Sequence, residues 1–225
     1  MLIAGSSVDL NNAITSLGAR RSLFHSEADF QFALAWEVQK ADNEISVYLE
    51  APIDDFERQK REHLDVLFER SGHFTALELK YLTRTWSGDI PHLNGVGQSY
   101  ALKNHSAHDH RRYDVVKDIV RVEKFVQSHP NANGAVVVLT NDPAYTKPSS
   151  GSTANDAAFR IGHGDVLHGP REWGRLPANK ERQNGLRLGQ SYEMKWSEFS
   201  TLGGEPLLWQ LVVEVAATPT IPRLS

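Results

Sequence analysis

Cysteine is absent from this 225-residue chain. The absence excludes disulfides and thiolate metal sites, so oxygen or imidazole ligands would have to hold any metal ion. No apolar run approaches the roughly 20 residues that a membrane-spanning helix needs, and the first residues lack the basic start and apolar stretch of a secretory signal. We therefore expect a cytoplasmic protein with no membrane partner.

An overall excess of basic residues is also lacking. The chain has 24 Lys and Arg against 28 Asp and Glu, whereas nucleic-acid-binding domains commonly carry more basic than acidic side chains. The charge is uneven, because residues 160–187 carry six basic side chains against three acidic ones. From this basic stretch we single out Arg171, Arg175 and Arg182 as candidate contacts to the phosphates of a nucleic acid.

What is present fits one ordinary globular domain. Hydrophobic residues make up 40% of the chain and charged residues 23%, a composition that can bury a sizeable core. We treat residues 1–225 as a single domain. The oligomeric state is open, and a homodimer is one option.

The first half of the chain carries strong periodic patterns. Ser26 is a typical helix cap, and Phe30, Leu34 and Val38 recur on one face of the helix that follows. Three strands are then predicted, around residues 44–51, 62–70 and 73–83, with a short turn between the last two.

The second half alternates strong and weak patterns. Residues 84–111 lose periodicity and are predicted to form a long loop, and a helix follows from about Arg112. The apolar run near residues 135–140 predicts a buried strand in a parallel environment. Residues 143–205 are predicted to be an irregular insertion, and residues 206–215 a final strand. The order predicts an α/β sandwich, with helices flanking a mixed central sheet.

Three charges interrupt the apolar strands. Asp65 lies within the second strand, and Glu78 and Lys80 share one face of the third, with Leu77 and Leu79 packing behind them. A buried charge costs several kcal/mol unless it is paired or bound to metal. Mg²⁺ or Mn²⁺ held by the two carboxylates and the backbone carbonyl of Leu79 would explain them, with Lys80 holding or helping to deprotonate the attacking water.

This pattern resembles the PD-(D/E)xK nuclease superfamily. Asp65, twelve further residues and then Glu78-Leu79-Lys80 correspond to its motif, although Leu64 stands where the motif has proline. The resemblance covers about residues 24–142 and implies a restriction-endonuclease-like core of helix, three strands, helix and strand. It implies that Asp65 and Glu78 bind the metal, that Lys80 is catalytic, and that Glu27 is the acid many members carry on the first helix.

The implied function is hydrolysis of phosphodiester bonds in nucleic acid, with DNA the expected substrate. Alternatives stay open at this point. Glu78 and Lys80 could form an ion pair on a solvated sheet face, with Asp65 paired to an arginine. The fold could serve a non-catalytic nucleic-acid-binding or protein-interaction module. Asp65 and Glu78 could also act as the acid and base of a glycosidase-like enzyme, which would leave Lys80 unexplained.

Several other residues have competing explanations. Glu27 could simply favour the helix dipole at its N-terminal turn. Lys117, at the start of the second long helix, is a candidate phosphate contact, although a pair with Asp114 on a solvated face would explain it as well. His105, His108 and His110 cluster in an aperiodic segment, for which an ordinary loop is a better explanation than zinc.

Overall fold

The computed structural model describes residues 1–55, 60–91, 97–149 and 153–217. Its centre is a six-stranded sheet in the order β1-β2-β3-β6-β10-β9. Only β3 and β6 pair in parallel, and the other neighbours are antiparallel, so the predicted α/β fold with a mixed sheet is confirmed. The six strands span β1 Ser46–Asp55, β2 Lys60–Arg70, β3 His73–Leu82, β6 Ala132–Thr140, β9 Trp196–Leu202 and β10 Glu205–Val215.

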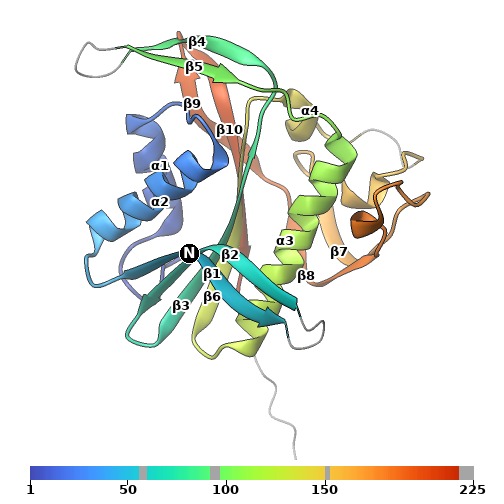
Figure 1. Cartoon of the computed structure of the whole chain (residues 1–225), viewed down its shortest axis with the longest axis horizontal. Coiled ribbons are helices and arrows are strands. Elements are labelled where there is room, and N and C mark those ends of the chain that lie inside the picture. Colours follow the sequence, from blue (N-terminus) through green and yellow to red (C-terminus); the bar gives the residue numbers. More distant parts are fainter. Residues whose placement is uncertain (56–59, 92–96, 150–152, 218–225) are drawn as a thin grey trace, which may run out of the picture.

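Helices cover both faces of this sheet (Figure 1). On one face lie α1 and α2, and on the other lies α3 with the small β7–β8 sheet. The three long helices are α1 Leu10–Arg20, α2 Glu27–Ala41 and α3 His108–Ser128. The core is accordingly split in two by the sheet: Val137 of β6 packs on the side of α1 and α2, and Val136 packs on the side of α3.

The predicted helix after Ser26 is confirmed as α2. The Ser26 hydroxyl accepts a hydrogen bond from the Asp29 N–H, which satisfies one of the free donors at the start of the helix. Phe30, Leu34 and Val38 are buried, as their spacing indicates. This cap fixes where α2 begins, and with it the position of Glu27.

A tight hairpin joins β2 to β3. Ser71 and Gly72 both have positive φ, 51° and 76°, which is the backbone twist that two-residue hairpins favour. The register pairs Val66 with Leu77, and β3 alternates between the two faces of the sheet. Leu77 and Leu79 pack toward α1 and α2, so Glu78 and Lys80 share the opposite face, as predicted, and that face is covered by α3.

The predicted parallel strand is confirmed as β6. The chain leaves β3, passes through α3 and returns beside β3, with Glu78 opposite Val136 and Lys80 opposite Val138. The strand is buried over most of its length, which explains its unbroken apolar run. This crossover places α3 directly over Glu78 and Lys80.

The prediction of a long loop over residues 84–111 is wrong. It contains the hairpin β4 (Trp86–Ile90) and β5 (Gln98–Leu102), and α3 already begins at His108. Both strands are short and expose alternate side chains, so only three of their residues, Ile90, Tyr100 and Leu102, are buried. That is too weak an alternation to stand out in the sequence.

The predicted irregular insertion at residues 143–205 also contains regular structure. It holds α4 (Pro143–Thr146), the 3₁₀ turns η1 (Ala157–Phe159) and η2 (Lys180–Arg182), the strands β7 (Val166–Arg171) and β8 (Leu186–Glu193), and β9. β7 and β8 carry internal glycines, and their ladder has an irregularity between Leu167 and Gly169. A strand that is bulged and half exposed lacks the clean period-two pattern on which prediction relies.

Helix α1 has no counterpart in the sequence prediction. Asp9 caps it by accepting from the Asn12 N–H, and the helix contacts α2 and β9. Within the described residues, no helix is both long and apolar enough to cross a membrane.

Candidate active site

The sheet opens where β2 and β3 separate. The last ladder pair between them is Val66 with Leu77, and beyond it the Asp65 carboxylate takes over as partner of β3. Its Oδ2 accepts a hydrogen bond of 2.6 Å from the Leu79 N–H. The carboxylate thus replaces a strand carbonyl, which fixes Asp65 beside Glu78 at the fork between the two strands.

The opposite side of Asp65 is also irregular. In the β1–β2 ladder Leu49 pairs with Val66 and Ala51 with Leu64, while Glu50 between them has a φ of 49°. A left-handed conformation is uncommon outside glycine and often marks a functional region. Asp65 is therefore held at a local disruption of the sheet on both of its edges.

Gln31 of α2 braces this disruption. Its amide nitrogen donates to the Asp65 carbonyl at 2.5 Å and to Glu50 Oε1 at 3.0 Å. The side chain is only 8% exposed. A buried amide in this position compensates the carbonyl that the sheet ladder leaves without a backbone donor.

Glu78 is the most buried charge of the site, at 1% exposed. Arg121 of α3 places Nη1 2.7 Å from Glu78 Oε1, an ion pair without hydrogen-bond geometry, and within the described structure Oε2 accepts no hydrogen bond. Burial raises the pKa of Glu78 to about 9, and repulsion from Asp118 adds to it against the attraction of Arg121. A buried carboxyl oxygen without a donor is the least satisfied group in the site.

Lys80 and Arg121 share Asp118. Lys80 Nζ lies 2.7 Å from Asp118 Oδ2 and donates to the Leu79 carbonyl at 3.0 Å, while Arg121 lies 3.3 Å from Asp118 Oδ1. Burial lowers the pKa of Lys80, but the carboxylates of Asp118, Glu27 and Asp65 outweigh burial and raise the pKa above its ordinary value. Lys80 therefore stays charged and serves as a hydrogen-bond donor in this arrangement.

Glu27 enters the same site from the start of α2. Its Oε2 accepts a 2.8 Å hydrogen bond from the N–H of Tyr81, one residue beyond Lys80. Burial raises the pKa of Glu27, with Lys80 opposing the shift. Burial likewise raises the pKa of Asp65 against the attraction of Lys80. Glu27 is thus more than a helix-dipole residue, because it is joined to β3 itself.

All four predicted catalytic residues line one cavity of about 690 Å³, and they are Glu27, Asp65, Glu78 and Lys80. Asp118 and Arg121 line it as well. When fully ionised, these four carboxylates exceed Lys80 and Arg121 by two negative charges, while Asp114 and the cations Lys103, Arg111, Lys117 and Arg182 also line the cavity. Desolvation and mutual repulsion make such an excess unfavourable unless a cation compensates it.

The alternative considered from the sequence, an ion pair between Glu78 and Lys80, does not form among the described residues. Each is paired instead with α3, Glu78 with Arg121 and Lys80 with Asp118. The burial of Glu78 also contradicts a solvated sheet face. The arrangement is therefore a buried network of charges between β3 and α3, and not an ion pair on a solvated sheet face.

Asp118 and Arg121 were missed in the sequence. The signal was present, because Val115, Asp118 and Val122 fall on one buried face of α3. An acid at 3% exposure between valines needs a partner for the same reason as Asp65 and Glu78. It went unnoticed because α3 also carries exposed charges at neighbouring positions.

The predicted phosphate contacts divide into two groups. Lys117 and Arg182 line the cavity, although Arg182 makes two 2.8 Å hydrogen bonds to Asp114. Arg171 does not line it and donates to the Pro170 and Ala158 carbonyls. Arg175 also lies outside it, with an exposed side chain and its backbone N–H bonded to Asn155.

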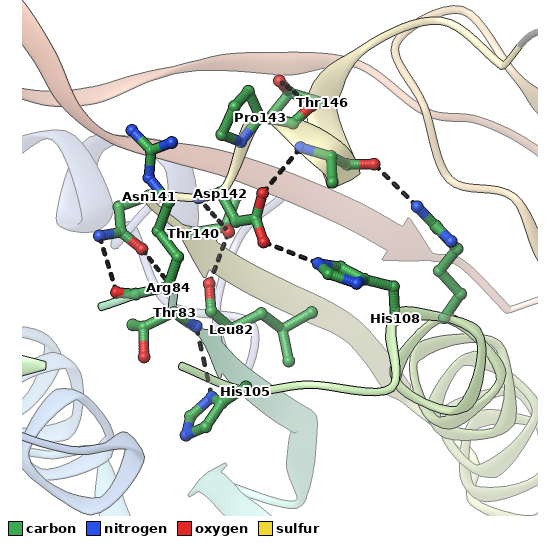
Figure 2. A network of polar contacts seen from close by, with 12 residues as sticks. Leu82, Thr83, Arg84, His105, His108, Thr140, Asn141, Asp142, Pro143 and Thr146 are labelled. Atoms are coloured by element: carbon green, nitrogen blue, oxygen red, sulfur yellow. Dashed lines mark hydrogen bonds and ion pairs between the residues drawn. The ribbon is translucent and has the colours of Figure 1, made fainter. Parts of the chain in front are cut away.

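A second polar network lies at the carboxyl ends of β3 and β6 (Figure 2). The backbone of Arg84 exchanges two hydrogen bonds with the Asn141 amide, at 2.8 and 3.2 Å, and the Thr140 hydroxyl donates to the Leu82 carbonyl at 2.5 Å. The His105 N–H donates to the Thr83 carbonyl at 2.7 Å. The Asn141 and Thr140 contacts join the ends of β3 and β6, and the His105 contact ties the segment before α3 to the end of β3.

The three clustered histidines have different partners. His105 Nδ1 accepts a 3.3 Å hydrogen bond from the Thr83 N–H, and His108 Nε2 lies 2.7 Å from Asp142 Oδ2 (Figure 2). His110 contacts the ring of Trp173 edge-on. Of the three, only His105 lines the cavity.

A metal ion would have to complete its coordination with non-protein ligands. Among the residues that the structure describes, no three His, Asp or Glu side chains are arranged to hold an ion by themselves. Asp65, Glu78 and the Leu79 carbonyl form a smaller oxygen set of the kind that Mg²⁺ completes with waters and phosphate oxygens. Glu78 Oε2, which accepts no hydrogen bond in the described structure, and its neighbouring carboxylates fit such a cation.

Comparison of the chain with family models, curated proteins and solved structures finds no match. The resemblance to PD-(D/E)xK nucleases therefore depends on the residues and elements described above.

Proposed function

We propose that this protein is a metal-dependent nuclease that hydrolyses phosphodiester bonds in nucleic acid, with DNA as the expected substrate. The observation that carries this proposal is the set of four carboxylates, Glu27, Asp65, Glu78 and Asp118, that line one cavity around Lys80 and Arg121. Within the described structure, Glu78 Oε2 of this set accepts no hydrogen bond. Strongly shifted pKa values in a cleft are typical of functional sites.

The order of elements supports the same proposal. α2, the antiparallel strands β1, β2 and β3, then α3 and the parallel strand β6 follow one another as in a restriction-endonuclease-like core. Asp65 lies on the second of these strands and Glu78 on the third, the positions that the resemblance implies. We propose this core as the finer description of the α/β fold.

The residues divide the work between them. Asp65, Glu78 and the Leu79 carbonyl would hold Mg²⁺ or Mn²⁺, which when bound supplies a polarised phosphoryl oxygen and an acidified water. Lys80 donates hydrogen bonds as an ammonium group, so it orients the attacking water or a phosphate oxygen. Asp118 and Glu27 keep Lys80 charged and in place.

A second candidate is a non-catalytic nucleic-acid-binding module on the same fold, and one observation favours it. Arg121 already lies against Glu78, and Asp118 already pairs with Lys80. If the guanidinium permanently takes the place of a metal ion, the site is a structural charge network that cannot hydrolyse a phosphodiester.

A cleavage assay separates these candidates. The purified protein is incubated with plasmid, single-stranded DNA and RNA, with EDTA, Mg²⁺ or Mn²⁺. A nuclease cleaves at least one substrate only with metal, and Asp65→Asn abolishes the cleavage. Glu123→Gln, a buried carboxylate variant outside the cavity, should keep it. Binding without cleavage under every condition supports the module, and cleavage that survives Asp65→Asn points to a contaminating nuclease.

A further inference from the structure

Two lysines of the cavity have no acidic partner among the residues that the structure describes. Lys103, just after β5, is exposed, and Lys117 of α3 is half-buried. No described carboxylate lies within ion-pair distance of either ammonium group. Arg182 differs, because Asp114 already binds it with two hydrogen bonds. The lysines are thus the cations of the cavity whose charge is left for a ligand.

His105 lines the same cavity in a fixed orientation. Its backbone and its ring Nδ1 are both bonded to Thr83, and the Thr83 hydroxyl donates to the Lys103 carbonyl at 2.7 Å. Because Nδ1 accepts a hydrogen bond, the proton of the neutral ring is on Nε2. Burial lowers the pKa of His105 and the charge of Arg111 lowers it further, against a backbone hydrogen bond with Tyr81 that raises it.

Other residues that line this cavity have the opposite character. Asp65 and Glu78 line the same cavity and call for a cation, whereas Lys103, His105 and Lys117 offer only hydrogen-bond donors. A phosphodiester bound to a metal ion satisfies both surfaces, because its free oxygens are acceptors and its charge is negative.

Resting on the nuclease function proposed above, we propose that Lys103, His105 and Lys117 form the phosphate-binding wall of the cleft. The two ammonium groups compensate backbone phosphates, and His105 donates from Nε2 to a non-bridging phosphate oxygen. The basic stretch 160–187 contributes Arg182 at the rim of this wall, but not Arg171 or Arg175.

Binding measured without metal tests the wall apart from catalysis. Fluorescence anisotropy in EDTA follows a labelled 20-mer, as DNA duplex, single-stranded DNA or RNA, over a series of salt concentrations. Lys117→Met should weaken binding roughly ten-fold at low salt, as expected for loss of a charge-assisted hydrogen bond. It should also lower the log-log salt slope by about one unit. Lys117→Arg should restore most of both.

Matched variants control for charge and folding. Lys124→Met removes the same charge two turns further along α3, outside the main cavity, and should leave affinity within about two-fold because it loses no phosphate contact. For the ring, His105→Asn keeps an acceptor for the Thr83 N–H but loses the Nε2 donor, whereas His105→Gln keeps a donor near Nε2. The Asn variant should bind several-fold more weakly than the Gln variant.

The outcomes keep the two proposals apart. Cleavage of nucleic acid by the wild type, with unchanged binding in Lys117→Met, Lys103→Met and His105→Asn, would overturn the wall and leave the nuclease standing. Binding that depends on these residues in a protein that never cleaves supports the wall and removes the nuclease. Melting temperatures of all variants are recorded, and equal loss of affinity in Lys124→Met and Lys117→Met would also overturn the wall.

Discussion

Two buried glutamates, Glu123 on α3 and Glu78 on the neighbouring strand β3, differ in how many donors and cations surround their carboxylates. Glu123, 3% exposed, accepts hydrogen bonds from the N–H groups of Gly189 and Gln190 and from the Tyr192 hydroxyl, at 2.7 to 3.0 Å. Glu78 has one ion pair, to Arg121, and its second oxygen has no partner in the described structure. Glu123 fastens β8 to α3, whereas Glu78 faces a cavity.

Under the proposed function, this difference separates a structural carboxylate, Glu123, from one that binds a ligand, Glu78. Burial removes the hydration of both carboxylates. At Glu123 the hydrogen bonds from β8 offset this loss, so its charge stabilises the fold. At Glu78 the single ion pair with Arg121 offsets only part of the desolvation cost, so stability alone does not explain a glutamate at this position. A ligand that supplies positive charge would complete it.

The largest expected effect is that substitution of Glu78 removes activity, whereas substitution of Glu123 lowers stability. Glu78→Gln should reduce metal-dependent cleavage by about a thousand-fold or more, because the charge that stabilises the reacting centre is lost. Glu123→Gln should leave cleavage nearly unchanged but destabilise the protein by about 2 kcal/mol. For a chain of this length that is a fall in melting temperature of roughly 4 to 8 °C.

Initial cleavage rates and melting curves of both variants check this prediction. A Glu78→Gln protein that cleaves normally, or a Glu123→Gln protein that melts as the wild type does, would erase the distinction between the two carboxylates.

A pH titration of stability should sharpen the comparison. Glu78 has a folded pKa near 9 against an ordinary value of 4.5, so over this window the folded protein binds more protons than the unfolded one. The free energy of unfolding should therefore fall as pH rises from 4.5 to 9, by at most about 1.4 kcal/mol per unit for this one group. Glu27 and Asp65 have raised pKa values and contribute with the same sign.

Urea unfolding of the metal-free protein at several pH values measures this slope. The slope should be shallower in Glu78→Gln, which cannot titrate, and unchanged in Glu123→Gln apart from a constant offset. Equal slopes in wild type and Glu78→Gln would show that Glu78 does not have the raised pKa on which this prediction depends.

A moderate effect is expected at Glu27. Glu27→Gln keeps an oxygen that can accept from the Tyr81 N–H but removes one negative charge from the cavity. The Mg²⁺ concentration needed for half-maximal cleavage should rise roughly ten-fold, as for other residues that support a metal site. A Glu27→Gln enzyme with wild-type metal dependence would return Glu27 to a role at the helix terminus.

The smallest effect is expected in the basic stretch. Arg171 and Arg175 lie outside the cavity, so their joint replacement by Met should leave the salt slope of nucleic-acid binding unchanged. Arg182→Met should lower the slope by at most about one unit, since Asp114 already compensates its charge. Anisotropy titrations at several salt concentrations measure both slopes, and a loss from the Arg171 and Arg175 variant would extend the interface beyond the cavity.

The sequence predicted the elements that are long and strongly patterned. Leu34 and Val38 indicated α2, and the valines of β6 indicated a buried parallel strand. β4, β5 and β7–β9 escaped notice because they are short or half exposed, so that few buried side chains mark their alternation. Their structure is determined by pairing with a neighbouring strand. That pairing is not visible in the local sequence pattern of either strand alone.

The candidate site divides in the same way. Asp65, Glu78 and Lys80 could be singled out because each interrupts an apolar strand. Asp118 and Arg121 are visible only once α3 is laid over β3, since exposed charges surround them in the sequence. Gln31 carries no local signal, because its role depends on a carbonyl that is free only where β2 and β3 separate.

The most direct measurement is the thermal response of the metal-free protein to Mn²⁺ or Mg²⁺. A cation bound only by the folded state at ten times its Kd adds about 1.4 kcal/mol, which should raise the melting temperature by roughly 3 to 6 °C. Glu123→Gln should show the same shift from a lower start. Glu78→Gln should show none, and without metal it should be as stable as the wild type, because Arg121 keeps Glu62 and Asp118 as partners. A wild-type protein indifferent to metal, together with a destabilised Glu78→Gln, would contradict the metal site.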